Sequence, residues 1–191
     1  MEITVIYSAM RTGSTSLCDY ISKNNFFNMR EIFNQGINKS LNKHQSIIIE
    51  KYGKDIKNVQ EFTNKIINYN DKNKVFKIFN NHMFYYFNKN DIEMNKRFIT
   101  YISSLTNINV KFIILKRDIC EMYRSLKNAQ INGDWTTKRT NKINFEINYN
   151  TDEFREYKNE LIKWYSNIEE IFNEKQINYE VIYFKNIVHL L

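Results

Sequence analysis

The 191-residue sequence contains no proline and only four glycines. It has no stretch rich in Gly, Ser or Pro that would link two domains, and it has no internal repeat. We therefore expect residues 1–191 to form one domain, with a length sufficient for a substantial hydrophobic core.

Cysteine is equally scarce. Cys18 and Cys120 fall in segments predicted to be helical, and they lack the paired spacing of a metal site or a disulfide framework. A reducing compartment is the simpler interpretation. No apolar run approaches the length of a membrane span, and the N-terminus lacks the pattern of a signal peptide. The expectation is a cytoplasmic protein without a membrane span.

Apolar residues make up 42% of the chain and aromatic residues 15%, which favours a folded protein over a disordered one. The formal net charge is +7 and the pI is near 9.2. This charge favours an anionic partner, such as nucleic acid, an acidic membrane surface or a phosphorylated small molecule. No long run of Lys or Arg is present, so nucleic acid is not the favoured partner.

Short apolar runs alternate with longer amphipathic segments. Strands are expected at Glu2–Tyr7, Lys74–Phe79, Val110–Leu115 and Glu180–Phe184. Helices are expected at Ser14–Asn24, Asp55–Asn68, Asp91–Leu105, Asp118–Ala129 and Thr151–Glu174, and Asn132–Asn150 is polar and turn-like. Asp91 and Thr151 are the expected caps of their helices. One face of the last helix is expected to be apolar, with Phe154, Tyr157, Leu161, Trp164, Ile168 and Phe172. The alternation predicts an α/β fold with a central, mostly parallel sheet flanked by helices. Ligands bind beyond the carboxyl ends of such strands, so functional residues are expected directly after strands.

The first strand leads into the segment SAMRTGSTS, residues 8–16. Gly13 allows a tight turn and a close approach of backbone to a ligand. The hydroxyl residues after it can cap the next helix, whose free N–H groups face an anion. Arg11 adds a permanent charge with a forked geometry suited to phosphate. A plain strand–turn–helix connection with a Ser/Thr cap is the alternative.

The loop differs from two common phosphate-binding loops. The G-x-x-x-x-G-K-[ST] pattern of a Walker A loop is absent. A phosphatase loop is also excluded, because no Cys precedes Arg11 at a suitable spacing.

The segment SAMRTGSTSLCDYI resembles the 5'-phosphosulfate loop of sulfotransferases that use 3'-phosphoadenylyl sulfate (PAPS). Its form is similar to that of bacterial carbohydrate enzymes such as trehalose sulfotransferase and nodulation-factor sulfotransferases. Met10 stands where those enzymes usually have Pro or a small polar residue. The resemblance implies a P-loop-like three-layer fold, PAPS as donor, adenosine 3',5'-bisphosphate (PAP) as product, and no metal. It implies donor contacts from Arg11, Thr12, Gly13, Ser14, Thr15 and Ser16.

A second segment, VKFIILKRDICEMYRSLKNA, fits the same family. The family places an Arg after a central strand and a Ser eight residues later to hold the 3'-phosphate, which implies this role for Arg117 and Ser125. Further on, SLKNAQINGDW is similar to a segment of the trehalose-type enzymes, and Trp135 would stack on adenine or sugar. Ordinary core packing is the alternative for Trp135. The closing YEVIYFKNI resembles the family's last strand, with Lys185 and Asn186 in place of an acidic pair.

An acceptor hydroxyl must lose a proton as it attacks sulfur, so a base is needed. Glu31 in NMREIF is the first candidate, because similar enzymes place a general-base Glu in a matching segment after the first helix. His82 in KIFNNHM is the second, although a lone His is more often structural. Lys77, within the preceding strand, either reaches the site or points to solvent. The acceptor pocket is expected in residues 26–50 and 131–150.

The sequence thus predicts a PAPS-dependent sulfotransferase that acts on a hydroxyl, with a carbohydrate or glycolipid as the expected acceptor. A P-loop nucleotide kinase or NTPase is an alternative, although Lys116 and Arg117 precede Asp118 where a Walker B strand would end in a metal-binding Asp. A degenerate nucleotide-binding protein without turnover is the non-enzymatic alternative. The oligomeric state is not predicted.

Overall fold

The computed structural model describes residues 1–31, 58–80, 91–132, 147–149 and 151–189. Five parallel strands form one sheet in the order β2-β3-β1-β4-β5. The strands are β1 (Glu2–Ser8), β2 (Phe26–Glu31), β3 (Asn73–Phe79), β4 (Asn109–Lys116) and β5 (Tyr179–Tyr183). The all-parallel sheet confirms the predicted α/β class.

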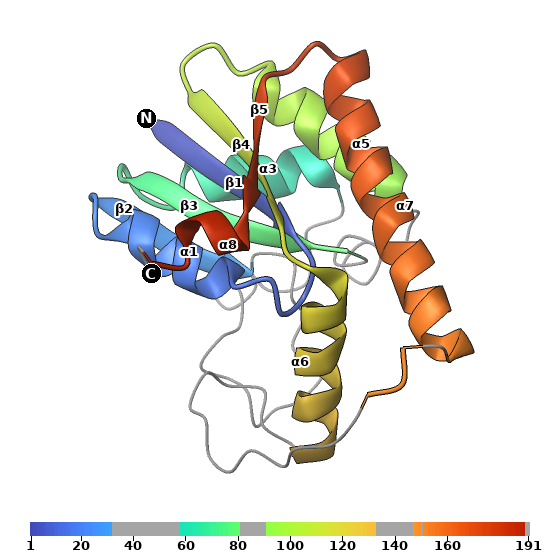
Figure 1. The fold of residues 1–191 in the computed structure, drawn as a ribbon. Helices are drawn as coiled ribbons and strands as arrows, with labels where there is room; N and C mark the ends of the chain where they lie inside the picture. The colour runs from blue at the N-terminus through green and yellow to red at the C-terminus, as the bar shows by residue number, and fades with distance from the viewer. Residues whose placement is uncertain (32–57, 81–90, 133–146, 150, 190–191) are drawn as a thin grey trace.

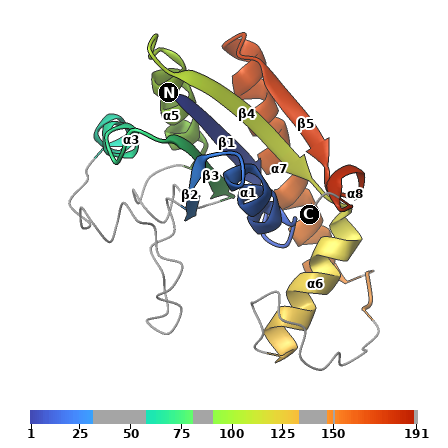
Figure 2. The same ribbon diagram turned by 90° about the vertical axis from the view of Figure 1, so that its left-hand side faces the viewer.

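Helices cover both faces of this sheet and give a three-layer architecture (Figures 1 and 2). The helices are α1 (Ser14–Ser22), α3 (Val59–Ile67), α5 (Asp91–Ser103), α6 (Ile119–Asn132), α7 (Asp152–Glu174) and α8 (Phe184–Ile187). The first face carries α3, α5 and α7, and the second carries α1 and α8. Helix α6 extends away from the sheet at the carboxyl end of β4 (Figure 1).

Alternation along the central strand divides the interior into two cores. Val5 and Tyr7 pack among the residues of α3, α5 and α7, whereas Ile6 packs against Leu17 and Cys18 of α1. Because successive side chains of a strand point to opposite faces, a strand covered on both sides is expected to be mainly apolar on both. This explains why the first strand appears in the sequence as an apolar run that only the buried Thr4 interrupts.

The long helix α7 follows its predicted pattern. Thr151 is the N-cap, and its hydroxyl oxygen accepts a hydrogen bond from the Phe154 N–H at 3.2 Å. The predicted apolar face is buried, apart from the half-buried Tyr157. No helix in the described part of the chain is both long and apolar enough to cross a membrane.

Three local expectations were wrong. Residues 26–31 form strand β2, which was not among the predicted strands. Asp91, expected as a cap, is the first residue of α5, and its carboxylate accepts a hydrogen bond from the indole N–H of Trp164 at 3.1 Å. The last strand ends at Tyr183, and Phe184 begins the short helix α8.

Candidate functional site

The strand order defines where a ligand crevice lies. The chain leaves β1 toward the β2 and β3 side of the sheet, and it leaves β4 toward β5 on the other side. In open α/β sheets, ligands bind at the carboxyl ends of two neighbouring strands whose connections diverge in this way. The loops after β1 and β4 carry the two predicted arginine motifs, so both motifs lie at this switch point.

The loop between β1 and α1 has an unusual backbone. Arg11 and Gly13 both have left-handed conformations, with φ of 68° and 87°. Gly13 is the N-cap of α1 and has no side chain to cap the helix, and the first turn contains no acidic residue. The expectation that a hydroxyl caps this helix was therefore wrong, and Ser14, Thr15 and Ser16 lie inside the helix. The positive end of α1 keeps its attraction for an anion.

The base of the loop is fixed by buried hydrogen bonds. The Thr12 hydroxyl donates to the Ala9 carbonyl at 2.8 Å, and Thr12 is fully buried. Tyr165 on α7 accepts from the Ala9 N–H at 3.0 Å and donates to the Leu115 carbonyl at 2.9 Å. Burial raises the pKa of Tyr165 well above its usual value, so it remains a neutral donor. One phenol thus ties the ends of β1 and β4 together, a role the sequence did not reveal.

The structure brings Arg11, Ser125 and Arg117 together. The Nε of Arg11 donates to the Ser125 hydroxyl oxygen at 2.9 Å, across 114 positions of sequence. The Nη1 of Arg117 donates to the carbonyl oxygen of Arg11 at 3.1 Å. The Nε of Arg117 also lies 3.0 Å from a carboxylate oxygen of Glu121, one turn along α6. Two permanent cations, a hydroxyl and a helix N-terminus therefore converge.

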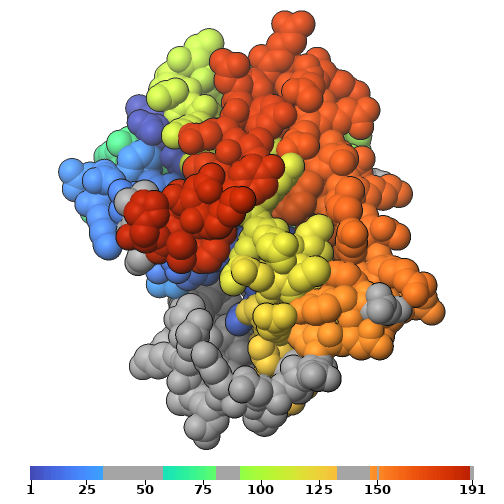
Figure 3. Space-filling view, viewed as in Figure 1, coloured from blue at the N-terminus to red at the C-terminus, as the bar shows by residue number. Residues whose placement is uncertain are grey.

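Phe184 is a member of this site that the sequence analysis missed. The Arg117 guanidinium lies over its ring, 4.8 Å from the centroid. A Cβ atom at Gly13 would come within 2.1 Å of the same ring. Lys185 and Asn186, which replace the family's acidic pair, are exposed in α8. Figure 3 shows this C-terminal segment, in red, at the surface beside α6 in yellow.

The Lys77 side chain points into the protein, which is one of the two directions expected for it. It is almost completely buried, and its ammonium donates a short hydrogen bond to the Thr15 hydroxyl in the first turn of α1. The same ammonium lies 3.1 Å from a carboxylate oxygen of Glu31. Glu31 is the last residue of β2, so this candidate base lies at the same edge of the sheet as the arginines.

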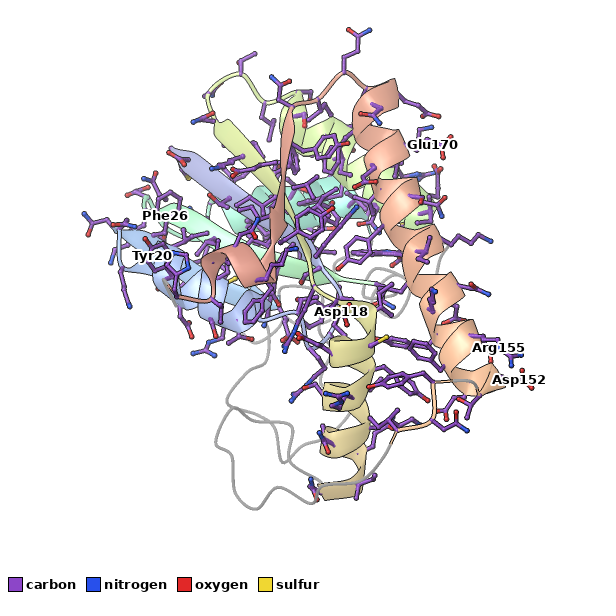
Figure 4. All side chains as sticks on the ribbon, viewed as in Figure 1. Tyr20, Phe26, Asp118, Asp152, Arg155 and Glu170 are labelled. Carbon is purple, nitrogen blue, oxygen red and sulfur yellow. The ribbon has the colours of Figure 1, made fainter. Side chains whose placement is uncertain are left out.

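Other charges near the arginine motifs point elsewhere. Lys116 pairs with Glu169 of α7 at 2.6 Å, and the Nε of Arg124 donates to the Tyr149 hydroxyl at 3.2 Å. Asp118 lies where β4 meets α6 (Figure 4), and its carboxylate accepts from the Glu121 N–H at 2.9 Å. The Asp118 carboxylate therefore accepts a hydrogen bond from the first turn of α6.

His82 and Trp135 lie outside the described residues, as does most of the expected acceptor pocket. Within the described ranges, no cluster of three or more His, Cys, Asp or Glu side chains could hold a metal ion.

The fold and this edge define an α/β domain with a five-stranded parallel sheet and a cationic site at its switch point. Comparison of the chain with protein-family models and with curated proteins gives no match. The function is therefore inferred from the residues and their geometry.

Proposed function

We propose that this protein is a PAPS-dependent sulfotransferase. The observation that carries the proposal is the convergence of two arginine motifs that are far apart in sequence. Arg11 and Ser125 are hydrogen bonded at 2.9 Å, and Arg117 contacts the backbone of Arg11 at 3.1 Å. A donor with a 5'-phosphosulfate and a 3'-phosphate needs two neighbouring anion sites, and we assign Arg11 to the first and Arg117 with Ser125 to the second.

In the proposed reaction, an acceptor hydroxyl oxygen attacks the sulfur of PAPS. The S–O bond to the 5'-phosphate breaks, and its electron pair remains on that phosphate, which leaves as part of PAP. The hydroxyl proton passes to the base, for which Glu31 is the described candidate and His82 the second. Arg11, Lys77 and the N-terminus of α1 stabilise the negative charge that builds on the leaving phosphate.

Lys77 favours this reaction over that of a magnesium-dependent kinase or NTPase. In a Walker A loop, the Ser or Thr two positions after the last Gly binds Mg²⁺ through its hydroxyl. Thr15 is two positions after Gly13, and here its hydroxyl accepts a hydrogen bond from the Lys77 ammonium. The chain thus supplies its own cation at this position.

Calorimetric titration with PAP, beside ATP with Mg²⁺, tests the proposal. We expect PAP to bind more tightly than ATP. Arg11→Ala and Arg117→Ala should each weaken PAP binding at least tenfold, since a hydrogen bond to a charged group contributes about 1.5–3 kcal/mol. Arg97→Ala is the matched control, because Arg97 pairs with Glu93 on the exposed face of α5. Preference for ATP, or PAP affinity unchanged in both site variants, would refute the proposal.

A carbohydrate or glycolipid acceptor and a cytoplasmic location belong to the same proposal. Transfer of radiolabelled sulfate from PAPS to a panel of sugars and glycolipids would identify the acceptor. Tight PAP binding without product from any acceptor would instead favour a nucleotide-binding protein without turnover.

A further inference from the structure

Among the described residues, the buried Lys77 ammonium is paired with one carboxylate and also lies over the ring of Phe79, 5.0 Å from its centroid. The Lys77 side chain is 4% exposed, whereas that of Glu31 is 21% exposed. Removing an ammonium from water is costly unless it is paired and hydrogen bonded. Lys77 meets this need with the Glu31 carboxylate at 3.1 Å and with the Thr15 hydroxyl. The Lys77 ammonium is therefore held between the carboxylate at the end of β2 and the first turn of α1.

A β-bulge creates this ion pair. The register between β2 and β3 pairs Asn28 with Val75, then shifts so that Arg30 pairs with Phe76 and Glu31 with Lys77. Without the shift, Arg30 would stand opposite Lys77, and two like charges would face each other.

The bulge is held in place by local contacts. Arg30 adopts a left-handed conformation with φ of 59°, and its N–H donates to the Asn28 side chain at 2.9 Å. Asn28 in turn donates to the Asp19 carboxylate of α1 at 2.7 Å. Strained residues and bulges of this kind concentrate at functional sites. The hydrogen bonds of Asn28 thus stabilise the left-handed conformation of Arg30, which places Glu31 opposite Lys77.

We propose that the Lys77–Glu31 pair is a switch opened by the donor. In the absence of donor, Lys77 binds Glu31. When the 5'-phosphate group binds at the N-terminus of α1, it takes over the Lys77 ammonium and releases the Glu31 carboxylate from it, so that Glu31 can accept the proton of the acceptor hydroxyl. This inference rests on the proposed sulfotransferase function, and it assigns Lys77 as a donor-binding residue that also controls the base.

The physical basis is competition for one cation. The phosphate and the Glu31 carboxylate carry charges of the same sign, and the Lys77 ammonium is within reach of both the carboxylate and the first turn of α1. Breaking the ion pair lowers the observed affinity for the phosphate by the free energy of that pair. Removal of the Glu31 charge should therefore strengthen phosphate binding, but only while Lys77 is present.

The test is a double-mutant cycle on PAP affinity, measured by calorimetry with Lys77→Met, Glu31→Gln and the double variant. Lys77→Met should weaken binding at least about tenfold, as expected for loss of a charged hydrogen bond. Glu31→Gln should strengthen binding about fivefold or more, the usual lower range of such coupling. In the Lys77→Met background, Glu31→Gln should have no such effect.

The pair Lys116–Glu169 provides the matched control. It joins the same residue types at 2.6 Å at the end of β4, with side chains 25% and 27% exposed. Lys116→Met and Glu169→Gln change the net charge as the test variants do, and neither should change PAP affinity by more than about twofold.

A second comparison locates the effect within the nucleotide. Adenosine 5'-monophosphate should show the changes caused by Lys77→Met and Glu31→Gln, whereas adenosine 3'-monophosphate should not. Folding of each variant is checked by thermal unfolding. The double variant removes both charges together, and this leaves no buried ion without its partner.

The outcomes separate the two proposals. Wild-type protein that does not bind PAP would overturn the proposed function and the switch together. Two results would overturn the switch alone, provided that PAP binding depends on both arginines. In the first, Glu31→Gln leaves PAP affinity unchanged or weakens it. In the second, Glu31→Gln strengthens PAP binding equally with and without Lys77.

Discussion

Gly13→Ala is expected to destabilise the protein strongly, for two reasons that can be measured separately. The residue has φ of 87°, and an L-residue in this left-handed region costs roughly 1–2 kcal/mol. The new Cβ atom would also lie 2.1 and 2.5 Å from two carbon atoms of the Phe184 ring. Displacing a packed ring costs about 1–3 kcal/mol. The sum predicts a loss of about 2–5 kcal/mol in the free energy of unfolding.

The Phe184→Ala background separates these contributions. Without the ring, Gly13→Ala retains its backbone cost of roughly 1–2 kcal/mol and loses the steric cost. The coupling between the two positions should therefore be about 1–3 kcal/mol. Phe184→Ala alone also removes the ring on which Arg117 lies, so its own cost must be measured as the reference.

Urea unfolding followed by circular dichroism gives the four free energies of this cycle. Thermal unfolding provides a second measurement, because each kcal/mol shifts the midpoint by about 2–4 °C in a chain of this size. A Gly13→Ala cost below about 1 kcal/mol would refute the argument from the left-handed conformation. An equal cost with and without Phe184 would refute the argument from the ring.

Two further predictions concern buried groups. Tyr165→Phe should lower the free energy of unfolding by roughly 1–3 kcal/mol, because it leaves a buried N–H without its acceptor; Tyr101→Phe, which removes an exposed hydroxyl bond, is the control and should cost less than half as much. Cys18 should resist thiol reagents at pH 8 until the protein is unfolded, since burial raises its pKa to about 12, whereas the exposed Cys120 should react at once. Because burial disfavours the Cys18 thiolate, the free energy of unfolding should fall as the pH rises from about 9 toward 12, by up to about 1.4 kcal/mol per pH unit. Cys18→Ala should abolish this part of the alkaline slope in urea unfolding. Rapid labelling of both thiols in the folded protein would contradict the burial of Cys18.

Much of the fold could be predicted from the sequence because its signals are local. Strands β1 and β3 and the second half of β4 are buried on both faces and therefore appear as mainly apolar runs, although β3 includes the buried Lys74 and Lys77. The 3.6-residue period and the Thr151 cap predicted α7. Strand β2 was missed, because FFNMRE is short, mixes polar with apolar residues and contains a bulge that breaks the alternation.

The sequence by itself singled out the loop with Arg11 and Gly13, and the Arg117 and Ser125 pair, because each is a local pattern placed directly after a strand. Tertiary structure alone decided that these motifs meet, and that Lys77 donates a hydrogen bond to Thr15 in the first turn of α1. It also decided that Phe184 fills the space beside Gly13. The physical reason is that sheet order and register are set by burial summed over the whole domain. These contacts join positions that are tens to more than a hundred residues apart. No local spacing in the sequence could therefore predict them.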